Sequence, residues 1–237
     1  MVKDYTVRIS ARAKRARLVV SMTEGLVVVV PKRFDRRRIP ALLESKQAWL
    51  ERTIDRVRSQ RTLMEPLPES GLPERLSLRA LGEEWAVIYA ATGSTRVTAR
   101  DQGEQCLTVS GNVSNVAECR DAIRRWLSRK ARERLIPQLE SLAVEMGLGF
   151  TRATVRMQKT RWGSCSHQGT ISLNLKLLFL PEPLARYVLV HELCHRLQMD
   201  HSSKFWDLVE RREPLYRQNE PALRSAFRYI PVWLESR

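Results

Sequence analysis

Residues 188–206 read VLVHELCHRLQMDHSSKFW and contain three of the four histidines of this 237-residue chain. His191 and His195 are four residues apart, so on a helix their Cβ atoms lie about 5–6 Å apart on one face. Two imidazoles at that separation can bind the same Zn²⁺ ion. The apolar neighbours Leu189, Val190, Leu193 and Leu197 predict that this helix is buried. Burying an imidazole on such a helix costs free energy unless its ring nitrogens have a partner, and a metal ion is such a partner.

Two further residues of the same stretch complete a predicted catalytic metal site. Glu192 is the next residue after His191, about 100° further around the helix, where it flanks the metal without being forced to bind it. His201 follows His195 by six residues, and a short turn at Asp200 would return its ring to the open side of the metal. Three nitrogen ligands leave a fourth position for water, whose proton Glu192 would accept as general base. The sequence therefore predicts one Zn²⁺ per chain and a hydrolytic reaction.

Two other interpretations of these histidines stay open. His191 and His195 could be satisfied core residues, with His201 at the surface. Alternatively, Cys194 or Cys165 could complete a closed structural zinc site. His167 is a weaker candidate ligand, and Cys165 is disfavoured as a nucleophile because His167 lacks an evident third partner.

The segment RWGSC at residues 161–165 is a candidate wall of the active cleft. Arg161 could neutralise an oxyanion or a phosphate, and Gly163 would permit close backbone approach. A strand here could bind an extended substrate by strand addition. We therefore expect Arg161, Trp162, Gly163 and Ser164 to contact substrate. The alternative is a hairpin anchored by Trp162 that packs against helix 183–199, with Arg161 on the surface.

The remaining patterns predict an α+β fold, sheet-rich in the N-terminal part and helical in the C-terminal part. Alternating and then continuous apolar residues predict two or three strands over residues 5–30, with a turn at Glu24–Gly25, and helical spacing follows over 39–58. The stretch EPLPESGLPE (65–74) reads as a linker. Beyond it we expect short strands over 76–109 and then an amphipathic helix that runs to about Gly147. Two further strands are predicted at 154–157 and 170–175. The chain should end in three helices, one over 183–199, one that starts at Ser202 or Ser203, and one after Pro221.

Composition limits the possible binding partners and cellular compartments of the protein. No run approaches eighteen apolar residues and no secretory signal opens the chain, so we expect a cytoplasmic protein without membrane contact, whose four cysteines are free thiols. The net charge of +15 is concentrated in RAKRAR (12–17) and KRFDRRR (32–38). This imbalance either attracts a polyanion, including nucleic acid, or is a solvated basic face.

The stretches HELCHRLQMDHSSKFW and KTRWGSCSHQGTISLNLKLLFLP resemble the YgjP-like metal-dependent hydrolases, relatives of SprT-like proteases and gluzincin metallopeptidases. YTVRISARAKRARLVV, GLVVVVP, KQAWLER and ARERLIPQLESLAVEMGL extend the resemblance over residues 5–230. It implies zinc ligands at His191, His195 and His201, an acid/base at Glu192, and a zincin-like catalytic part whose HExxH helix packs on a small sheet. We expect a basic hairpin and helix subdomain over 1–64 and a catalytic region over 75–237, within one YgjP-like domain.

The predicted reaction is therefore attack on a peptide carbonyl by a zinc-bound water that Glu192 activates. The substrate is a peptide or protein, or a nucleotide. Hydrolysis of a nucleoside triphosphate is the first alternative, because water activated in this way also attacks phosphorus. A nucleic-acid-associated SprT-like protease is the second.

Overall fold

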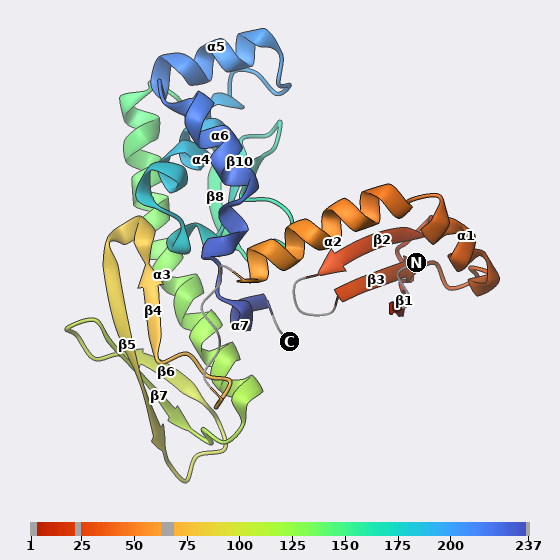
Figure 1. Cartoon of the computed structure of the whole chain (residues 1–237). Helices are drawn as coiled ribbons and strands as arrows, with labels where there is room; N and C mark the ends of the chain where they lie inside the picture. The colour runs from red at the N-terminus through yellow and green to blue at the C-terminus, as the bar shows by residue number, and fades with distance from the viewer. Residues whose placement is uncertain (1–3, 22–24, 63–68, 236–237) are drawn as a thin grey trace. The chain divides into compact units, whose positions relative to one another are not determined.

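The computed structural model describes residues 4–21, 25–62 and 69–235, and the chain divides into two compact units (Figure 1). The first unit comprises residues 1–66 and 235–237, and the second comprises residues 67–234. The division falls within the predicted linker at 65–74, of which residues 65–68 lie outside the described residues.

The first unit is built on a three-stranded sheet in the order β1-β3-β2. Its strands are β1 (Thr6–Ile9), β2 (Arg17–Ser21) and β3 (Gly25–Val30). β3 is buried from Leu26 to Val30, in keeping with its unbroken apolar run, and it pairs parallel with β1 and antiparallel with β2. The strands were predicted, whereas the parallel pairing of β1 was not. Of the predicted turn at Glu24–Gly25, Glu24 lies outside the described residues.

One helix was expected over residues 39–58, and the structure has two. After a 3-10 turn η1 (Arg36–Arg38), the chain forms α1 (Ile39–Glu44) and α2 (Gln47–Thr62). The Ser45 hydroxyl donates to the carbonyl of Leu42 at the end of α1. Such local side-chain bonds compete with the helical ladder and favour a break. The prediction of a single helix was wrong at this point.

The second unit contains a four-stranded sheet packed on one long helix. The strands β4 (Arg75–Leu78), β5 (Glu83–Ala91), β6 (Thr98–Asp101) and β7 (Cys106–Gly111) lie in the order β4-β5-β7-β6, with 3-10 turn η2 (Arg79–Leu81) after β4. The helix α3 (Val116–Glu145) begins at Asn115, whose side chain accepts from the Glu118 N–H as an N-cap. Trp126 of α3 meets Trp85 of β5 edge-on at 4.8 Å between ring centroids. These strands and this helix confirm the predictions for residues 76–147.

The same long helix also contacts a second, three-stranded sheet in the order β8-β10-β9. Its strands are β8 (Arg152–Arg156), β9 (Gly163–Cys165) and β10 (Thr170–Asn174), and 3-10 turn η3 (Leu175–Phe179) follows. β8 pairs parallel with β10, and β9 pairs antiparallel with β10. Two strands were predicted here. The connection containing RWGSC supplies the third, because Gly163, Ser164 and Cys165 pair with Leu173, Ser172 and Ile171.

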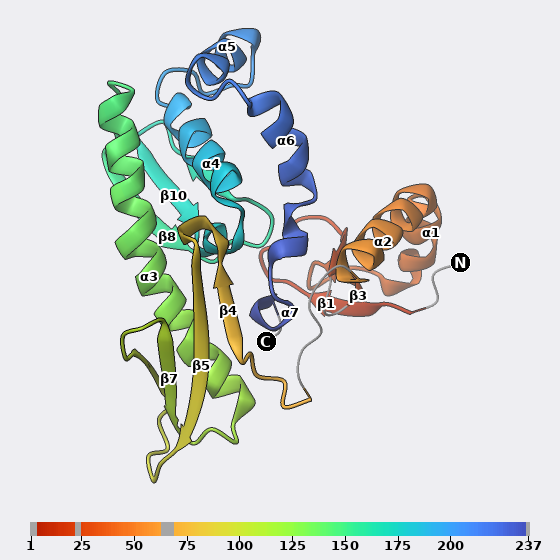
Figure 2. The ribbon, with the colours of Figure 1, turned by 60° about the vertical axis from the view of Figure 1, so that its left-hand side comes forward.

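The helix α4 (Glu182–Cys194) packs against β9, β10 and α3, as Figure 2 shows. It ends at Cys194 rather than near Met199, so Leu197 lies beyond the helix and is 54% exposed. The prediction that Leu197 is buried was wrong, while Leu189, Val190 and Leu193 are buried as predicted.

The last part of the chain is helical. It comprises α5 (Ser203–Arg212), α6 (Tyr216–Arg224), 3-10 turn η4 (Ala226–Tyr229) and α7 (Val232–Glu235). Ser202 occupies the N-cap position of α5. A helix was expected to follow Pro221, but α6 begins five residues earlier and contains this proline.

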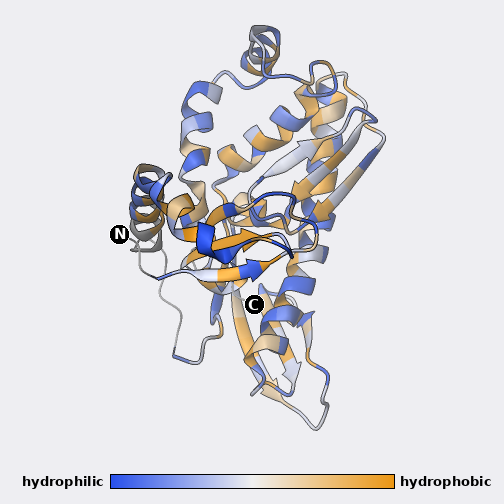
Figure 3. Cartoon of the chain, turned by 90° about the vertical axis from the view of Figure 1, so that its right-hand side faces the viewer, coloured by the Kyte–Doolittle hydropathy of each residue, from blue (hydrophilic) through white to orange (hydrophobic). Residues whose placement is uncertain are grey.

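Together these elements confirm the α+β fold class. Hydrophobic and hydrophilic stretches occur in both the strands and the helices (Figure 3). The four cysteines are free thiols, as expected. Among the described helices, none combines the length and the apolar character needed to cross a membrane.

Candidate metal centre

The three histidines of residues 188–206 come together at the end of α4. The Nε2 atoms of His191 and His201 lie 3.1 Å apart, and one ligand atom from each of His191, His195 and His201 lies within 4.8 Å of the others. Nitrogen ligands at about 2.0–2.1 Å from a tetrahedral zinc ion are roughly 3.3 Å apart. The His191–His201 distance fits a single metal ion as it stands, and the third imidazole lies close enough to join it after a shift of its ring.

The imidazoles reach this point from two segments of the chain. His191 is in the last turn of α4 and His195 is its C-cap, so their i, i+4 spacing survives the early end of the helix. His201 lies in the segment between α4 and α5. His195 is buried, His191 is half-buried and His201 is exposed, so the cluster has one side toward solvent.

A hydrogen bond orients the ring of His195. Its Nδ1 lies 3.0 Å from the carbonyl oxygen of Gln198. This carbonyl accepts a hydrogen bond, so the proton resides on Nδ1 and Nε2 keeps its lone pair. The side chain of Gln198 donates to Asp200, which also accepts from the Ser202 N–H. The turn that carries His201 is therefore held by the same hydrogen-bonded chain.

Phe205 of α5 contacts all three imidazoles. Its ring is stacked on His195 at 4.5 Å between centroids and meets His191 at 4.9 Å and His201 at 4.8 Å edge-on. The side chain is fully buried. Sequence analysis assigned no role to Phe205, because an apolar residue in the first turn of a helix usually indicates core packing.

The charges of the rings suit a metal cation. Burial, together with the neighbouring His195 and His201, lowers the pKa of His191 to about 3. Burial also lowers the pKa of His195. Neutral imidazole is the form that binds a divalent metal, so these two candidate ligands would need no deprotonation at pH 7.

Glu192 lies beside the histidines and is only 6% exposed. Its Oε2 atom has no hydrogen-bond partner among the described residues. Burial raises the pKa of this carboxyl group to about 8, while the positive charge of Arg161 acts in the opposite direction. A divalent cation nearby favours the ionised form of such a carboxyl group.

The RWGSC segment supplies the wall next to Glu192. A Cβ atom at Gly163 would lie 2.6 Å from Oε1 and 2.7 Å from Cγ of Glu192, so any larger residue would displace the Glu192 side chain. Ser164 lies in the middle of β9, half-buried. The alternative for this segment was a hairpin anchored by Trp162 on helix 183–199, with Arg161 on the surface. The structure agrees in part: β9 and β10 contact α4 and Arg161 is exposed, while the ring of Trp162 lies 4.5 Å from Phe227 of η4.

Asn174, which sequence analysis missed, holds this wall in place. It is fully buried at the end of β10, and its Nδ2 donates to the carbonyls of Gln158 at 2.9 Å and Arg161 at 2.7 Å. Its backbone N–H donates to the carbonyl of Trp162. A polar residue that ends an apolar strand was the available signal, but its partners lie 12–16 residues away in sequence.

The thiols stay outside the cluster. Among the described residues, the group of possible ligands consists of the three histidines without Cys194 or Cys165. Burial raises the pKa of Cys194 to about 11, and burial likewise raises the pKa of Cys165. His167 lies in the exposed turn between β9 and β10 and does not belong to the group either.

Comparisons with known proteins agree with this arrangement. The family described as "YgjP-like, metallopeptidase domain" matches residues 14–226. The crystal structure of the metallopeptidase zymogen of Pyrococcus abyssi abylysin is 29% identical, covering 36% of this chain and 91% of that chain. Its TM-score of 0.31 is too low to support an argument about the fold. No curated protein matches the sequence. On the strength of the family match over most of its length, the chain belongs to the YgjP-like family of metallopeptidase domains.

Proposed function

We propose that this chain is a zinc-dependent peptide hydrolase in which His191, His195 and His201 hold the ion and Glu192 is the general base. The observation that carries the proposal is the convergence of three imidazole nitrogens within 4.8 Å, beside a buried carboxylate that lacks a hydrogen-bond partner among the described residues. A zinc ion held there supplies a Lewis acid that polarises a carbonyl and lowers the pKa of water.

We assign the proton transfer to Glu192. It follows His191 on α4, and Gly163 limits the space on its other side. We infer that its carboxylate accepts a proton from the attacking water and delivers it to the leaving amine. Arg161 is exposed and close enough to lower the pKa of Glu192, so its guanidinium can stabilise negative charge that develops on the substrate.

The edge of β9 supports a peptide as the substrate. Hydrogen bonds join Asn174 to Trp162 and Ser166 to Thr170, so in this antiparallel ladder Ser164 also bonds toward β10. The N–H and C=O groups of Gly163 and Cys165 therefore point to the other side, where no described strand pairs with β9. An extended peptide can add to this edge, and Gly163 would then hold it beside Glu192.

The experiment measures metal content and cleavage on the same preparations. Wild-type protein should contain about one zinc ion per chain by elemental analysis and should cleave members of an unstructured peptide library, with loss of cleavage after chelation. Glu192→Gln should keep the ion and lose roughly 10²–10⁴ in rate, the usual contribution of a general base. Glu182→Gln is the matched control, because Glu182 lies exposed in the first turn of the same helix.

Two outcomes would contradict the proposal. Glu192→Gln with wild-type cleavage would exclude the assigned role. Release of phosphate from nucleoside triphosphates, without cleavage of any peptide, would instead favour the phosphohydrolase alternative.

A further inference from the structure

Two basic segments that are distant in sequence leave the sheet of the first unit at the same end. The Ser10 N–H donates to the carbonyl of Val30 at 2.8 Å, so the chain after β1 starts beside the end of β3. The following segment, RAKRAR (12–17), returns to the sheet at Arg17, the first residue of β2, which pairs with Val29 of β3. The second segment, KRFDRRR (32–38), continues directly from Val30. The topology therefore joins the two segments, which we call the basic end.

Each segment is anchored by one apolar side chain. Ala16 and Phe34 pack against the core cluster of Val28, Val30 and Ile39. All the cationic side chains of the two segments are exposed, four in the first and five in the second: Arg12, Lys14, Arg15 and Arg17, and Lys32, Arg33, Arg36, Arg37 and Arg38. The anchors hold the backbone to the sheet, so the charges are presented by folded segments.

Acidic partners are scarce around these cations. Asp35 is the single acidic residue within the two segments, and its carboxylate accepts from the Arg37 N–H as the cap of η1. In the described part of the chain, none of the nine side chains forms a salt bridge. Like charges that are gathered without counter-ions repel one another, and an external polyanion would relieve this repulsion.

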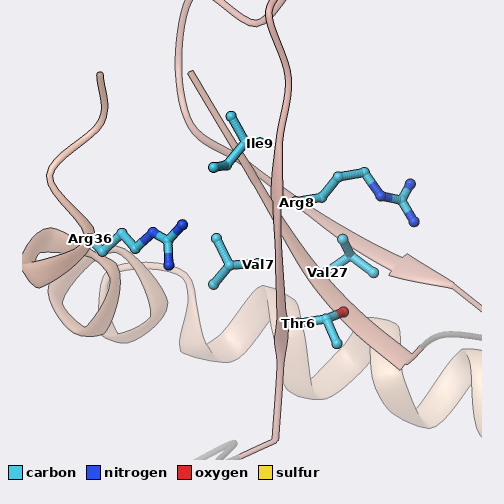
Figure 4. Close-up of a pocket in the computed structure, with 6 residues that line it drawn as sticks. All are labelled: Thr6, Val7, Arg8, Ile9, Val27 and Arg36. Atoms are coloured by element: carbon cyan, nitrogen blue, oxygen red, sulfur yellow. The ribbon is translucent and has the colours of Figure 1, made fainter. Parts of the chain in front are cut away.

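An arginine also flanks the adjoining edge strand. A pocket along β1 is lined by Val7, Ile9 and Arg36 on one side of the strand, and Arg8 extends on the other side (Figure 4). Arg36 belongs to the basic end, so this pocket, whose other lining residues are uncharged apart from Arg8, adjoins the basic end.

We propose that the basic end binds the phosphate backbone of a nucleic acid without reading its sequence. Seven of its nine cations are arginines, whose planar guanidinium groups bind phosphate through two parallel hydrogen bonds. A membrane surface fits less well, because interfacial binding also requires apolar side chains at the lipid boundary. In these segments Phe34, the one large apolar residue, packs against the core, whereas the exposed Ile9 lies on the neighbouring strand β1.

The test is fluorescence anisotropy of the full chain with labelled 20-nucleotide duplex and single-stranded DNA and RNA over a series of salt concentrations. We expect the logarithm of the association constant to fall linearly with the logarithm of the salt concentration. Two variants each remove three charges, Arg12→Gln/Lys14→Gln/Arg15→Gln and Arg33→Gln/Arg36→Gln/Arg37→Gln. If the three side chains contact phosphates, each variant should reduce the slope on duplex DNA by about 3 and weaken binding roughly 100-fold or more at 0.1 M salt.

A matched control removes the same charge from the second unit. Arg100→Gln/Arg132→Gln/Arg152→Gln changes three exposed arginines and should bind with a slope close to that of the wild type. The two basic-end variants are tested separately, and circular dichroism verifies that each is folded. The proposal does not depend on the metal centre, so Glu192→Gln and chelated protein should bind as wild type does.

Three results would overturn the proposal. An equal loss of affinity in the control variant would show a diffuse effect of net charge. Binding that does not change with salt would exclude phosphate contacts. Capture by phosphatidylserine vesicles, in the absence of binding to any of the oligonucleotides, would identify a membrane surface instead.

Discussion

Gly163 shows how one missing side chain shapes the candidate site. Its α-carbon lies against the carboxylate of Glu192, where a methyl group would come within 3 Å of three side-chain atoms. The steric demand arises from two residues on different elements, β9 and α4. Sequence analysis anticipated close approach of the backbone at Gly163, although it expected a substrate rather than Glu192 to be the neighbour.

Gly163→Ala should displace Glu192 while leaving the histidines in place. Misplacement of a catalytic group by about 1 Å can cost roughly 100-fold in rate. We therefore expect peptide cleavage to fall by about that factor, while the metal content stays near one ion per chain. Gly93→Ala is the control, because no atom lies within 4 Å of the added methyl group. Full activity in Gly163→Ala would show that Glu192 is not constrained by this contact.

Asn174→Ala should destabilise the second unit and disturb the wall next to Glu192. The substitution leaves the carbonyls of Gln158 and Arg161 without their donor, and an unsatisfied buried group costs about 1–3 kcal/mol. Urea denaturation should show a loss of that order, with a larger loss of activity than of metal affinity. Asn112→Ala, at an exposed turn position, should change stability by less than about 0.5 kcal/mol.

The turn between α4 and α5 determines where His201 lies. Asp200 accepts from the Gln198 side chain at 2.9 Å and from the Ser202 N–H at 3.0 Å. Gln198 in turn orients His195 through its carbonyl. Two ligands therefore depend on one short segment outside the helix, which is a common arrangement around metal-binding histidines.

Asp200→Ala should loosen this turn and weaken metal binding by about 10-fold, within the usual range for residues that orient metal ligands. Competition with a chromophoric zinc chelator measures the affinity. Asp207→Ala, in the exposed face of α5, is the control and should bind as wild type does. Equal affinities for both variants would show that the turn is held by other contacts.

The packing of β5 on α3 predicts a dependence of stability on pH. Glu83 lies 3.0 Å from Lys130 and 2.9 Å from Arg134. Burial raises the pKa of Glu83, but hydrogen bonds from Lys130 and Trp85 and the positive charges of Lys130 and Arg134 outweigh it, so the pKa is lowered from its ordinary value. A depressed folded-state pKa contributes stability above the unfolded value of about 4.3, which is lost as the pH falls through the folded value.

The free energy of unfolding should therefore decrease as the pH is lowered below about 5. In Glu83→Gln this decrease should be smaller, and stability near pH 7 should be lower than in the wild type. Glu133→Gln, an exposed substitution on α3, should retain the wild-type profile. Parallel profiles for Glu83→Gln and wild type would contradict the assignment.

Metal binding should stabilise the second unit, because unfolding of that unit separates the histidines of α4 from His201. A ligand present at 100 times its dissociation constant adds about 2.7 kcal/mol. Chelation should lower the melting temperature, and zinc should restore it. His201→Ala should melt at the same temperature with and without chelator. A wild-type melting temperature that is insensitive to chelator would argue against a bound metal.

Much of the fold and the candidate site followed from local patterns. Helical spacing predicted α3 and the pairing of His191 with His195, because residues four apart on a helix share a face whatever the rest of the chain does. The resemblance of the zinc-helix and RWGSC segments to YgjP-like proteins was confirmed by the family match. Local patterns gave the wrong helix ends in three places: the break between α1 and α2, the end of α4 and the start of α6.

Contacts between distant segments depended on strand register and on packing, which no local pattern encodes. The pairing of β9 with β10 places Gly163 against Glu192, and the parallel pairing of β1 with β3 joins residues 12–17 to residues 32–38. Residue types along the chain thus identified which groups can bind a metal or a phosphate. Folding determined which of those groups meet, because their separation in space depends on long-range hydrogen bonding and burial.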